Sequence, residues 1–239
     1  MELQKKKELL ELCSRASLLA GKAILEIYNS DFAVEHKDDK SPLTEADKQS
    51  HFTIMEILKE TGIPILSEEG RDIPFEERKD WDYFWMIDPL DGTKEFVKRN
   101  GEFTVNIALI HEQKAIMGII YVPVKDDLYI GAQGIGSFKV EGFSELKDAS
   151  IEALLNDKTK LPKAVDRKYT IVGSRSHKSA ETEEFIEAKR VEQGEIEMIS
   201  VGSSLKLCMV AEGLADDYPR FAPTMEWDTA AGQAIVEAM

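Results

Sequence analysis

A series of short apolar segments between residues 64 and 140 constrains the fold of this chain more than any other feature of its sequence. The segments are rich in β-branched and aromatic residues, which is typical of strands. Turns of only a few residues, such as 111–114 and 125–127, separate the later segments and favour hairpins. The pattern predicts an antiparallel sheet, with strands at residues 64–66, 83–87, 103–110, 115–122, 128–132 and 137–140.

Two helices are predicted before this sheet. Apolar residues recur at helical spacing along most of the first 28 residues, which indicates one long amphipathic helix. A second helix begins after Thr44, a residue that can cap it with Asp47 three positions on, and Gly62 ends it. We therefore expect helices at 2–28 and 44–62, a short strand at 32–36, and a polar loop at 37–42.

The second half of the chain mixes helical and strand patterns. Residues 141–168 are polar and weakly patterned, so we take them as the boundary between two contiguous halves, 1–140 and 141–239. Helices packed on sheets are the expected architecture, an α/β chain of the layered α+β type. Beyond the boundary we expect strands at 169–172, 196–201 and 216–218, and helices at 180–191, 205–212 and from Thr229 onward.

The charge balance limits the possible partners. Thirty Lys and Arg residues stand against 45 Asp and Glu residues, which gives a formal net charge of -15. This balance repels polymeric nucleic acid and anionic lipid at long range. A small anion remains possible, because a bound divalent metal can reverse the local field where acidic residues converge. Alternatively, the excess of acid serves only to keep the protein soluble.

Cysteine usage and the N-terminus indicate a compartment. Cys13 and Cys208 lie in apolar surroundings and are expected to be small buried hydrophobes, which fits a reducing setting. Residues 1–12 are too charged for a signal peptide, and no apolar run approaches the roughly 18 residues of a membrane span. We expect a cytoplasmic protein without stable membrane insertion.

The most informative stretch is an apolar strand that ends in two carboxylates, Asp88 and Asp91. Pro89 fixes its own φ and Gly92 allows a tight backbone path, so both acids are expected to face one way. The carbonyl of Leu90 lies between them. Hard oxygen donors of this kind suit Mg²⁺ or Ca²⁺, whereas zinc would be expected to recruit His or Cys.

A simple turn is the alternative, because Asp, Pro and Gly are all turn formers. Glu68 and Glu69 at the end of another predicted strand, and Asp228 at the start of the last predicted helix, add further acids at the ends of elements. Each of these also has a structural alternative, the glutamates as a solvated pair and Asp228 as a helix cap. Together, these acids at the ends of elements favour a metal site.

The same residues lie in motifs that resemble those of the inositol monophosphatase superfamily, which comprises metal-dependent, lithium-inhibited phosphatases. The resemblance runs from the first helix to the last residue, and Thr44-Glu45-Ala46-Asp47 is similar to the family's upstream element. It implies an alternating αβαβα sandwich of the inositol monophosphatase and fructose-1,6-bisphosphatase type. The motifs are Leu66-Ser67-Glu68-Glu69-Gly70, Ile87-Asp88-Pro89-Leu90-Asp91-Gly92-Thr93 and Glu226-Trp227-Asp228-Thr229-Ala230-Ala231-Gly232.

Within the superfamily the chain most resembles the CysQ type, the 3′(2′),5′-bisphosphate nucleotidases. This implies hydrolysis of the 3′-phosphate of 3′-phosphoadenosine 5′-phosphate to AMP and phosphate in sulfur metabolism, with the sulfated precursor of that nucleotide as a second candidate substrate. Inositol phosphatases do not usually carry the last two of the motifs on which this resemblance rests. These motifs are Lys94-Glu95-Phe96, Gly173-Ser174-Arg175-Ser176-His177, Val201-Gly202-Ser203-Ser204-Leu205-Lys206 and Tyr218-Pro219-Arg220-Phe221.

The resemblance also implies two or three Mg²⁺ ions. One would be held by Glu68, Asp88 and the Leu90 carbonyl, and another by Asp88, Asp91 and Asp228. Paired metals of this kind lower the pKa of a water, neutralise phosphoryl oxygens and stabilise the leaving oxygen.

Thr93 and Asp47 match the family's water-activating pair, and Glu68 is counted with them as catalytic. The Thr93 hydroxyl can accept the proton of the attacking water only if another group draws off its own, and Asp47 is expected to do so. Asp47 alternatively acts only as a first-turn carboxylate near a helix N-terminus. The two roles are compatible.

Substrate recognition is expected to involve basic residues of the second half, near helix starts that suit phosphate. Taken singly, His177 or Lys206 would more often be a surface residue, but a basic set beside the site could hold a second phosphate. The expected substrate-binding residues are Gly92, Thr93, Ser174, Arg175, His177, Gly202, Lys206, Arg220 and Asp228.

Two other functions stay open on the sequence alone: an inositol or sugar monophosphatase of the same superfamily, and a non-catalytic acidic module that binds Ca²⁺. The spacing of Asp88 and Asp91 argues against a calcium loop of the EF-hand type, which needs alternating ligands. Family members usually continue past the last motif, so the end at Met239 leaves open a truncation and an uncovered edge of the second sheet. Either a monomer or a homodimer is compatible with the sequence.

Overall fold

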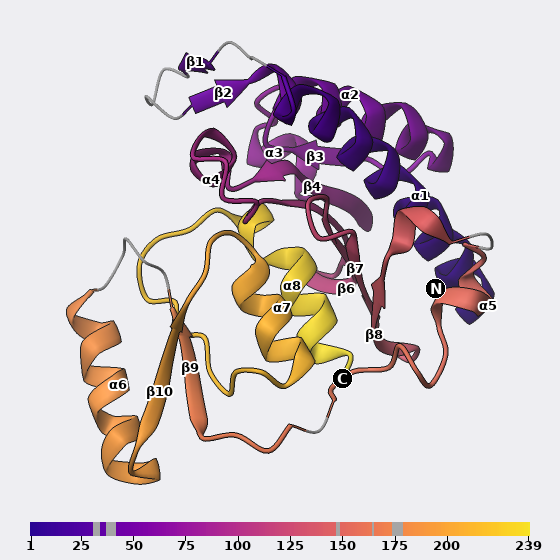
Figure 1. Cartoon of the computed structure of the whole chain (residues 1–239). Coiled ribbons are helices and arrows are strands. Elements are labelled where there is room, and N and C mark those ends of the chain that lie inside the picture. Colours follow the sequence, from indigo (N-terminus) through magenta and orange to yellow (C-terminus); the bar gives the residue numbers. More distant parts are fainter. Residues whose placement is uncertain (31–33, 37–41, 147–148, 164, 174–178) are drawn as a thin grey trace.

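Layers of helix and sheet alternate in the order helix, sheet, helix, sheet, helix in the computed structural model (Figure 1). The structure describes residues 1–30, 34–36, 42–146, 149–163, 165–173 and 179–239. The layered architecture expected from the sequence is confirmed. The first layer holds α1 (Leu3–Tyr28) and α2 (Glu45–Leu58), the second is a six-stranded sheet, the third holds α7 (Leu205–Glu212) and α8 (Ala230–Glu237), the fourth holds β9 (Tyr169–Gly173) and β10 (Ile196–Ser200), and the fifth is α6 (Ala180–Gln193).

Helix α1 covers one face of the large sheet with a single apolar stripe. Leu9, Cys13, Ala16, Ala20 and Ile24 are almost completely buried. These positions recur every three or four residues and therefore lie on one side of the helix. The stripe joins α2 and the inner face of the sheet in one hydrophobic core. The long amphipathic helix expected at the N-terminus is confirmed.

The large sheet has the strand order β3-β4-β5-β6-β7-β8. Strands β4 to β8 pair antiparallel, as the hairpin pattern predicts. The expectation of a wholly antiparallel sheet is wrong at its first strand, because β3 runs parallel to β4. Residues 68–82 between them contain α3 (Phe75–Arg78) and are long enough to bring the chain back to the same edge. The strands are β3 (Ile65–Ser67), β4 (Tyr83–Asp91), β5 (Thr104–His111), β6 (Lys114–Val122), β7 (Asp127–Ala132) and β8 (Gly136–Glu141).

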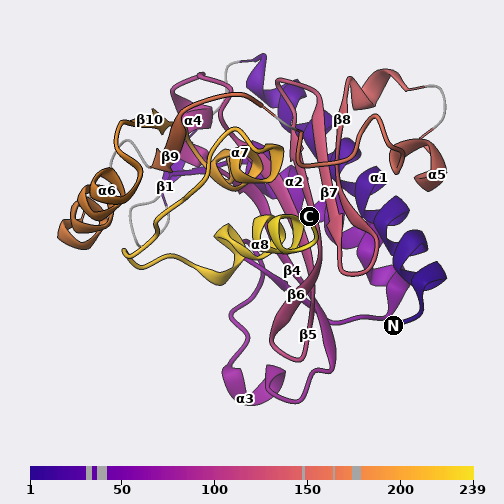
Figure 2. The same cartoon turned by 90° about the horizontal axis from the view of Figure 1, so that it is seen from below.

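Helices α7 and α8 cover the opposite face of this sheet from α1 and α2 (Figure 2). Helix α8 approaches so closely that only glycine fits beneath it. A Cβ on Gly118 of β6 would lie 2.1 Å from the carbonyl oxygen of Ala231, and one on Gly131 of β7 would lie 2.4 Å from the Cα of Ile235. The helix that follows Asp228 therefore packs directly on strands β6 and β7.

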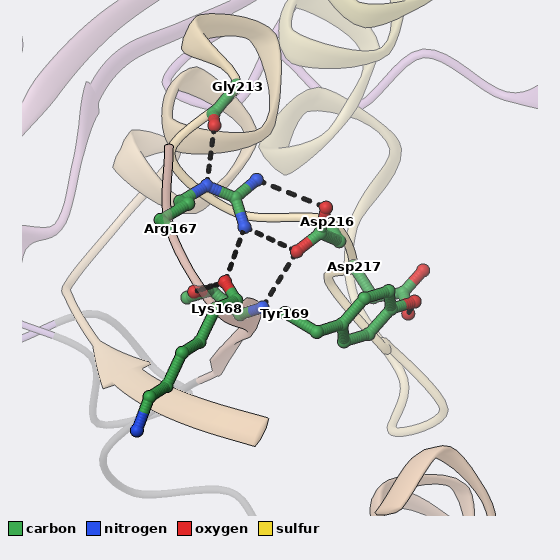
Figure 3. A network of polar contacts seen from close by, with 7 residues as sticks. Arg167, Lys168, Tyr169, Gly213, Asp216 and Asp217 are labelled. Atoms are coloured by element: carbon green, nitrogen blue, oxygen red, sulfur yellow. Dashed lines mark hydrogen bonds and ion pairs between the residues drawn. The ribbon is translucent and has the colours of Figure 1, made fainter. Parts of the chain in front are cut away.

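The second sheet is tied to the chain after α7 by Arg167 (Figure 3). Arg167 Nε donates to the carbonyl oxygen of Gly213 at 2.7 Å, and the guanidinium also binds both carboxylate oxygens of Asp216. Asp216 in turn accepts the backbone N–H of Thr170 at 2.7 Å. Strands β9 and β10 pair in parallel. Where the sequence indicates a strand at 216–218, the structure has a single β-bridge, between Asp217 and Ile171 of β9.

Residues 141–168 contain more ordered structure than their weak patterning indicates. Phe143, Ile151 and Leu154 are buried in the same core that α1 covers. Elements of three or four residues are too short to show a hydrophobic period, so sequence analysis misses them. The division of the chain into two halves stays a prediction. The helix expected at 44–62 is confirmed as α2, which ends in a 3₁₀ turn at Lys59–Thr61. Elements without a counterpart in the expected set are β2 (Pro42–Thr44), which pairs with β1 (Val34–His36), α3, α4 (Thr93–Val97), α5 (Ile151–Leu154) and 3₁₀ turns at Phe143–Glu145 and Glu226–Asp228.

No helix in the part of the chain that the structure describes combines the length and the apolar character needed to cross a bilayer.

The close seat of α8 gives a stability test. We expect Gly118→Ala to lower the free energy of unfolding by about 1–3 kcal/mol, because the added methyl group overlaps the Ala231 backbone. Urea unfolding followed by circular dichroism measures the change. Gly173→Ala is the matched control, since a Cβ there meets no atom of the described residues within 4 Å, and it should stay within about 0.5 kcal/mol of wild type. Equal stability of Gly118→Ala and wild type would contradict the described packing.

Candidate active site

The parallel pairing of β3 with β4 sets the geometry of the acidic site. Because the two strands run in the same direction, their carboxyl ends meet at one edge of the sheet. Ser67 pairs with Ile87, and the Glu68 N–H donates to the Ile87 carbonyl oxygen at 3.1 Å. Glu68, which directly follows β3, therefore lies beside Asp88 of β4. An antiparallel β3 would have carried Glu68 to the other end of the sheet.

A β-bulge separates the two aspartates of β4. Asp88 pairs with Asn106 and Asp91 pairs with Thr104, so two residues of β4 lie opposite one residue of β5. Pro89 suits this position, since it has no N–H to give to the ladder. The bulge is the structural reason for the spacing of the two acids in the sequence.

One buried face of α2 supports both acidic loops. Asp47, Ser50 and His51 lie three and four positions apart, on the same side of the helix, and all three are buried. Ser50 Oγ donates to the carbonyl oxygen of Pro89 at 2.7 Å, and His51 Nδ1 lies 2.9 Å from Ser67 Oγ. Burial lowers the pKa of His51. The helix thus contacts the chain next to Glu68 and inside the bulge.

Asp88 is the electrostatic centre of the site. Its side chain is 1 % exposed, and burial raises its pKa well above the ordinary value of 3.8. Repulsion by other carboxylates raises it further, which shows that the acids lie within one field. The pKa of Asp91 is raised by burial too, while a hydrogen bond from Ser204 opposes that shift. The carboxylates that act on Asp88 are Asp91, Glu68, Asp47 and Asp228.

Asp228 lies near the other carboxylates, but its side chain is hydrogen-bonded within its own turn. Its Oδ2 accepts hydrogen bonds from Thr224 Oγ1 and from the Met225 backbone N–H. Across the described residues, no three Asp, Glu, His or Cys side chains are arranged as a ready-made metal site. The acids therefore share an electrostatic environment without converging on one point. The ligand set expected from the sequence stays a prediction.

A pocket beside Asp91 and Asp228 also carries basic side chains, Lys94, Lys206 and Arg220. Lys206 is 7 % exposed, and burial lowers its pKa. Its ammonium group donates to the backbone carbonyl of Ser203 and lies 5.5 Å from the centre of the Tyr218 ring. Lys206 is thus already bound by protein groups, unlike the exposed surface lysine that its sequence context alone would suggest.

The other expected site residues fall in three places. Gly92 has a left-handed φ of 94°, and Thr93 directly after it begins α4. The Leu90 N–H donates to Asp88 Oδ1 at 3.1 Å, and the Gly202 N–H donates to Glu102 Oε2 at 2.8 Å. The remaining three, Ser174, Arg175 and His177, lie outside the described residues.

Sequence reasoning assigned no role to several polar residues that the structure brings to the site. Thr104 and Asn106 are fully buried within an apolar strand, and Asn106 Nδ2 donates to Ser204 Oγ at 2.9 Å. A buried polar residue inside an apolar run is the signal that could have identified them, because such groups need partners. Lys94 and Tyr218 were noted only as parts of motifs, yet both line the pocket.

The alternating layers and the acidic edge of the sheet define the chain as an αβαβα sandwich protein. Its sequence matches the inositol monophosphatase family over residues 5–239. The chain therefore belongs to the inositol monophosphatase family, which confirms the resemblance drawn from its motifs.

Individual relatives support this assignment. A protein of Shigella flexneri named 3′(2′),5′-bisphosphate nucleotidase CysQ is 45 % identical over 224 residues, which cover 92 % of this chain and 83 % of that protein. The crystal structure of CysQ from Bacteroides thetaiotaomicron is 48 % identical with a TM-score of 0.87, covering 97 % of this chain and 86 % of the other. An inositol monophosphatase from Anabaena is 25 % identical with a TM-score of 0.71, covering 97 % of this chain and 81 % of the other.

The buried charge of Asp88 gives a pH-dependent prediction. A carboxyl whose pKa is raised by folding makes the folded state less stable as pH rises above the ordinary value of 3.8. With metals removed by a chelator, we expect Asp88→Asn to be more stable than wild type at pH 8, and the gain to shrink toward pH 5. Urea unfolding at several pH values measures this. Asp72→Asn, at an exposed position, is the control, and its stability relative to wild type should not change between pH 5 and pH 8 in this way. A less stable Asp88→Asn at pH 8 would contradict the electrostatic account.

Proposed function

We propose that the chain is a magnesium-dependent 3′(2′),5′-bisphosphate nucleotidase that converts 3′-phosphoadenosine 5′-phosphate to AMP and phosphate, in sulfur assimilation and nucleotide recycling. The observation that carries this proposal is a single pocket lined by two aspartates of the acidic set and by three basic side chains. Acids can hold a cation and bases can hold phosphate groups, which is the combination that such a substrate needs. The names of relatives at 45 and 48 % identity support the same activity.

The donor chemistry fits Mg²⁺. The proposed ligands are oxygen atoms without His or Cys, and the raised pKa of Asp88 reflects buried like charges that a cation would stabilise. When bound, the ions supply charge that neutralises phosphoryl oxygens and acidifies a water molecule. The groups that would hold two or three ions are the Glu68, Asp88, Asp91 and Asp228 carboxylates and the Leu90 carbonyl.

In the proposed mechanism, side chains of the protein accept the proton of the attacking water. Thr93 follows the left-handed Gly92 at the start of α4 and is half-buried, whereas Asp47 is 2 % exposed on the α2 face that supports the acidic loops. In this proposal Thr93 holds the attacking water, accepts its proton and passes its own hydroxyl proton to Asp47. Water oxygen forms the new bond to phosphorus while the bond to the 3′ oxygen breaks, and the released 3′ oxygen takes up a proton from solvent water to become the hydroxyl group of AMP. No covalent enzyme intermediate is needed.

Arg220 is the basic residue best placed to bind the second phosphate. Its Nη2 donates to the Pro223 carbonyl oxygen at 3.2 Å, while its buried Nε has no hydrogen-bond partner among the described residues. Lys94 in the same pocket is exposed. The Lys206 ammonium is occupied by backbone carbonyls, so a direct contact with substrate would require it to leave them. The proposed contacts of Ser174, Arg175 and His177 remain part of this hypothesis.

A cytoplasmic location is part of the proposal. Cys13 and Cys208 are both buried, free thiols, and burial raises their pKa values, which makes them unreactive. Unbridged buried cysteines are compatible with a reducing compartment.

A substrate panel separates the proposed nucleotidase from its alternatives. We expect phosphate release from adenosine 3′,5′-bisphosphate with Mg²⁺ to exceed release from inositol monophosphate and fructose bisphosphate by at least about tenfold. Asp91→Asn should reduce release at least about a hundredfold, because it removes charge from a metal ligand at constant volume. Preference for inositol monophosphate would favour the sugar or inositol phosphatase. Absence of release from every substrate would leave the non-catalytic module.

The role of Arg220 predicts a selective defect. Loss of a charged hydrogen bond to phosphate costs about 1.5–3 kcal/mol, so Arg220→Ala should lower kcat/KM for adenosine 3′,5′-bisphosphate roughly ten- to a hundredfold. A small sugar monophosphate that lacks the second phosphate should be hydrolysed about as slowly by the variant as by wild type. Arg190→Ala on α6, where Arg190 pairs with Glu187 at 3.1 Å, is the matched control. Equal losses for both substrates would remove Arg220 from phosphate recognition.

A further inference from the structure

A buried polar network connects strand β5 to the turn before α7. It consists of Thr104, Asn106 and Ser204, which are 0 %, 1 % and 3 % exposed. Thr104 and Asn106 point to the same face of β5, because residues two apart in a strand share a face. Ser204 lies 98 positions after Asn106 in the chain. We call these three residues the Ser204 network.

The network ends on Asp91. Thr104 Oγ1 donates to Asn106 Oδ1 at 2.9 Å, and Asn106 Nδ2 donates to Ser204 Oγ at 2.9 Å. Ser204 Oγ lies 2.7 Å from Asp91 Oδ2, and Asn106 Nδ2 lies 3.5 Å from the same oxygen. Ser204 Oγ is also 3.0 Å from the backbone carbonyl oxygen of Asp228. One hydroxyl group therefore contacts two segments that carry proposed metal ligands.

The directions of these hydrogen bonds follow from the chemistry of the groups. The Thr104 hydroxyl orients the Asn106 amide, and the reverse orientation would bring the amide oxygen toward the negative Asp91 carboxylate. Ser204 Oγ accepts from Asn106, so its single proton is free to be donated. The ionised Asp91 carboxylate is a stronger acceptor than the Asp228 carbonyl and is also closer. The Ser204 hydroxyl therefore donates its hydrogen bond to Asp91.

The turn that carries Ser204 is itself held in place. Ser203 adopts a positive φ of 46°, which is uncommon for a residue other than glycine. The Lys206 ammonium donates back to the Ser203 carbonyl, and Gly202 donates its N–H to Glu102. A Cβ on Gly92 would lie 3.2 Å from the Cβ of Ser203, so the turn packs against the loop that follows Asp91.

We propose that Ser204, oriented by Asn106, is a positioning residue that fixes the Asp91 carboxylate for metal binding and couples the turn before α7 to the acidic loop. This inference rests on the proposed function, because it assigns Ser204 to the same site. Groups that hydrogen-bond to metal-ligating carboxylates commonly change metal affinity or activity ten- to a hundredfold when they are removed. The Ser204 hydroxyl is such a group, and it arrives from a part of the chain distant from the other acidic motifs.

The test uses Mg²⁺-dependent thermal stability of the full chain without substrate, together with Mg²⁺-dependent phosphate release. We expect Ser204→Ala to raise the Mg²⁺ concentration for half of the maximal Tm shift about tenfold or more, and to raise the concentration for half-maximal activity similarly. Ser17→Ala is the matched control: the Ser17 hydroxyl is also buried, but within the described part of the chain it donates only to the backbone carbonyl of Ser14 in α1. This control should alter Tm without changing either Mg²⁺ dependence.

The outcomes separate the inference from the function on which it rests. Unchanged Mg²⁺ dependence in Ser204→Ala, with wild type responding to Mg²⁺, overturns the positioning role alone. A wild type that shows neither a Mg²⁺-dependent Tm shift nor phosphate release overturns both. If Ser204→Ala does not fold, Thr104→Val decides, because it removes only the hydroxyl that orients Asn106. A raised Mg²⁺ requirement in that variant supports the network, and an unchanged requirement overturns it.

Discussion

The burial of like charges at one edge of the large sheet is the constraint on which the rest of the site depends. Asp88 is almost fully buried beside other carboxylates, and burial and repulsion both raise its pKa. Such a cluster is unfavourable unless its members are hydrogen-bonded or neutralised. The fold supplies neutral donors to both buried aspartates of β4, because the Leu90 N–H donates to Asp88 and the Ser204 hydroxyl donates to Asp91. The remaining negative charge is what makes the edge suitable for a divalent cation.

Helix α7 connects the acidic site to the second half of the chain, because both of its ends form hydrogen bonds with the large sheet. Ser204 at its start contacts Asp91, as described above. At its end, Glu212 accepts hydrogen bonds from Tyr129 of β7 at 2.6 Å and from Lys139 of β8 at 2.9 Å. Lys139 and Glu212 are largely shielded from water, and Lys139 also pairs with Asp127 and Glu141 at 3.3 Å each, so their contact is part of a larger charge network at the end of α7. Two polar anchors on one short helix restrict how far the acidic loop and the turn before α7 can move apart.

Much of the fold follows from local patterns. The stripe of α1 and the hairpins of β5 to β8 were predictable because hydrophobic periodicity and short turns are local properties of the chain. The acidic motifs were predictable as well, since Pro89 restricts the backbone around the aspartates and Gly92 permits the tight path that follows them. The parallel pairing of β3 was missed, because Ile65–Ser67 is too short to show its direction and its neighbour is chosen by a crossover through α3. Thr104 and Asn106 were missed because their partner lies in another half of the sequence.

The sequence by itself determined the residue types of the site, the helical and strand periods, and the family to which the motifs point. It also determined the bulge-forming Pro89 and the acids around it, because these depend on the conformational limits of single residues. Only the tertiary structure decided that Glu68 leaves its strand beside Asp88, that Lys206 is bound to backbone carbonyls, and that Ser204 reaches Asp91. The first and third of these features depend on strand direction and on a contact across 113 positions, which are selected by the packing of whole layers. The Lys206 contacts span only three to five positions, and they depend on the conformation of the turn before α7.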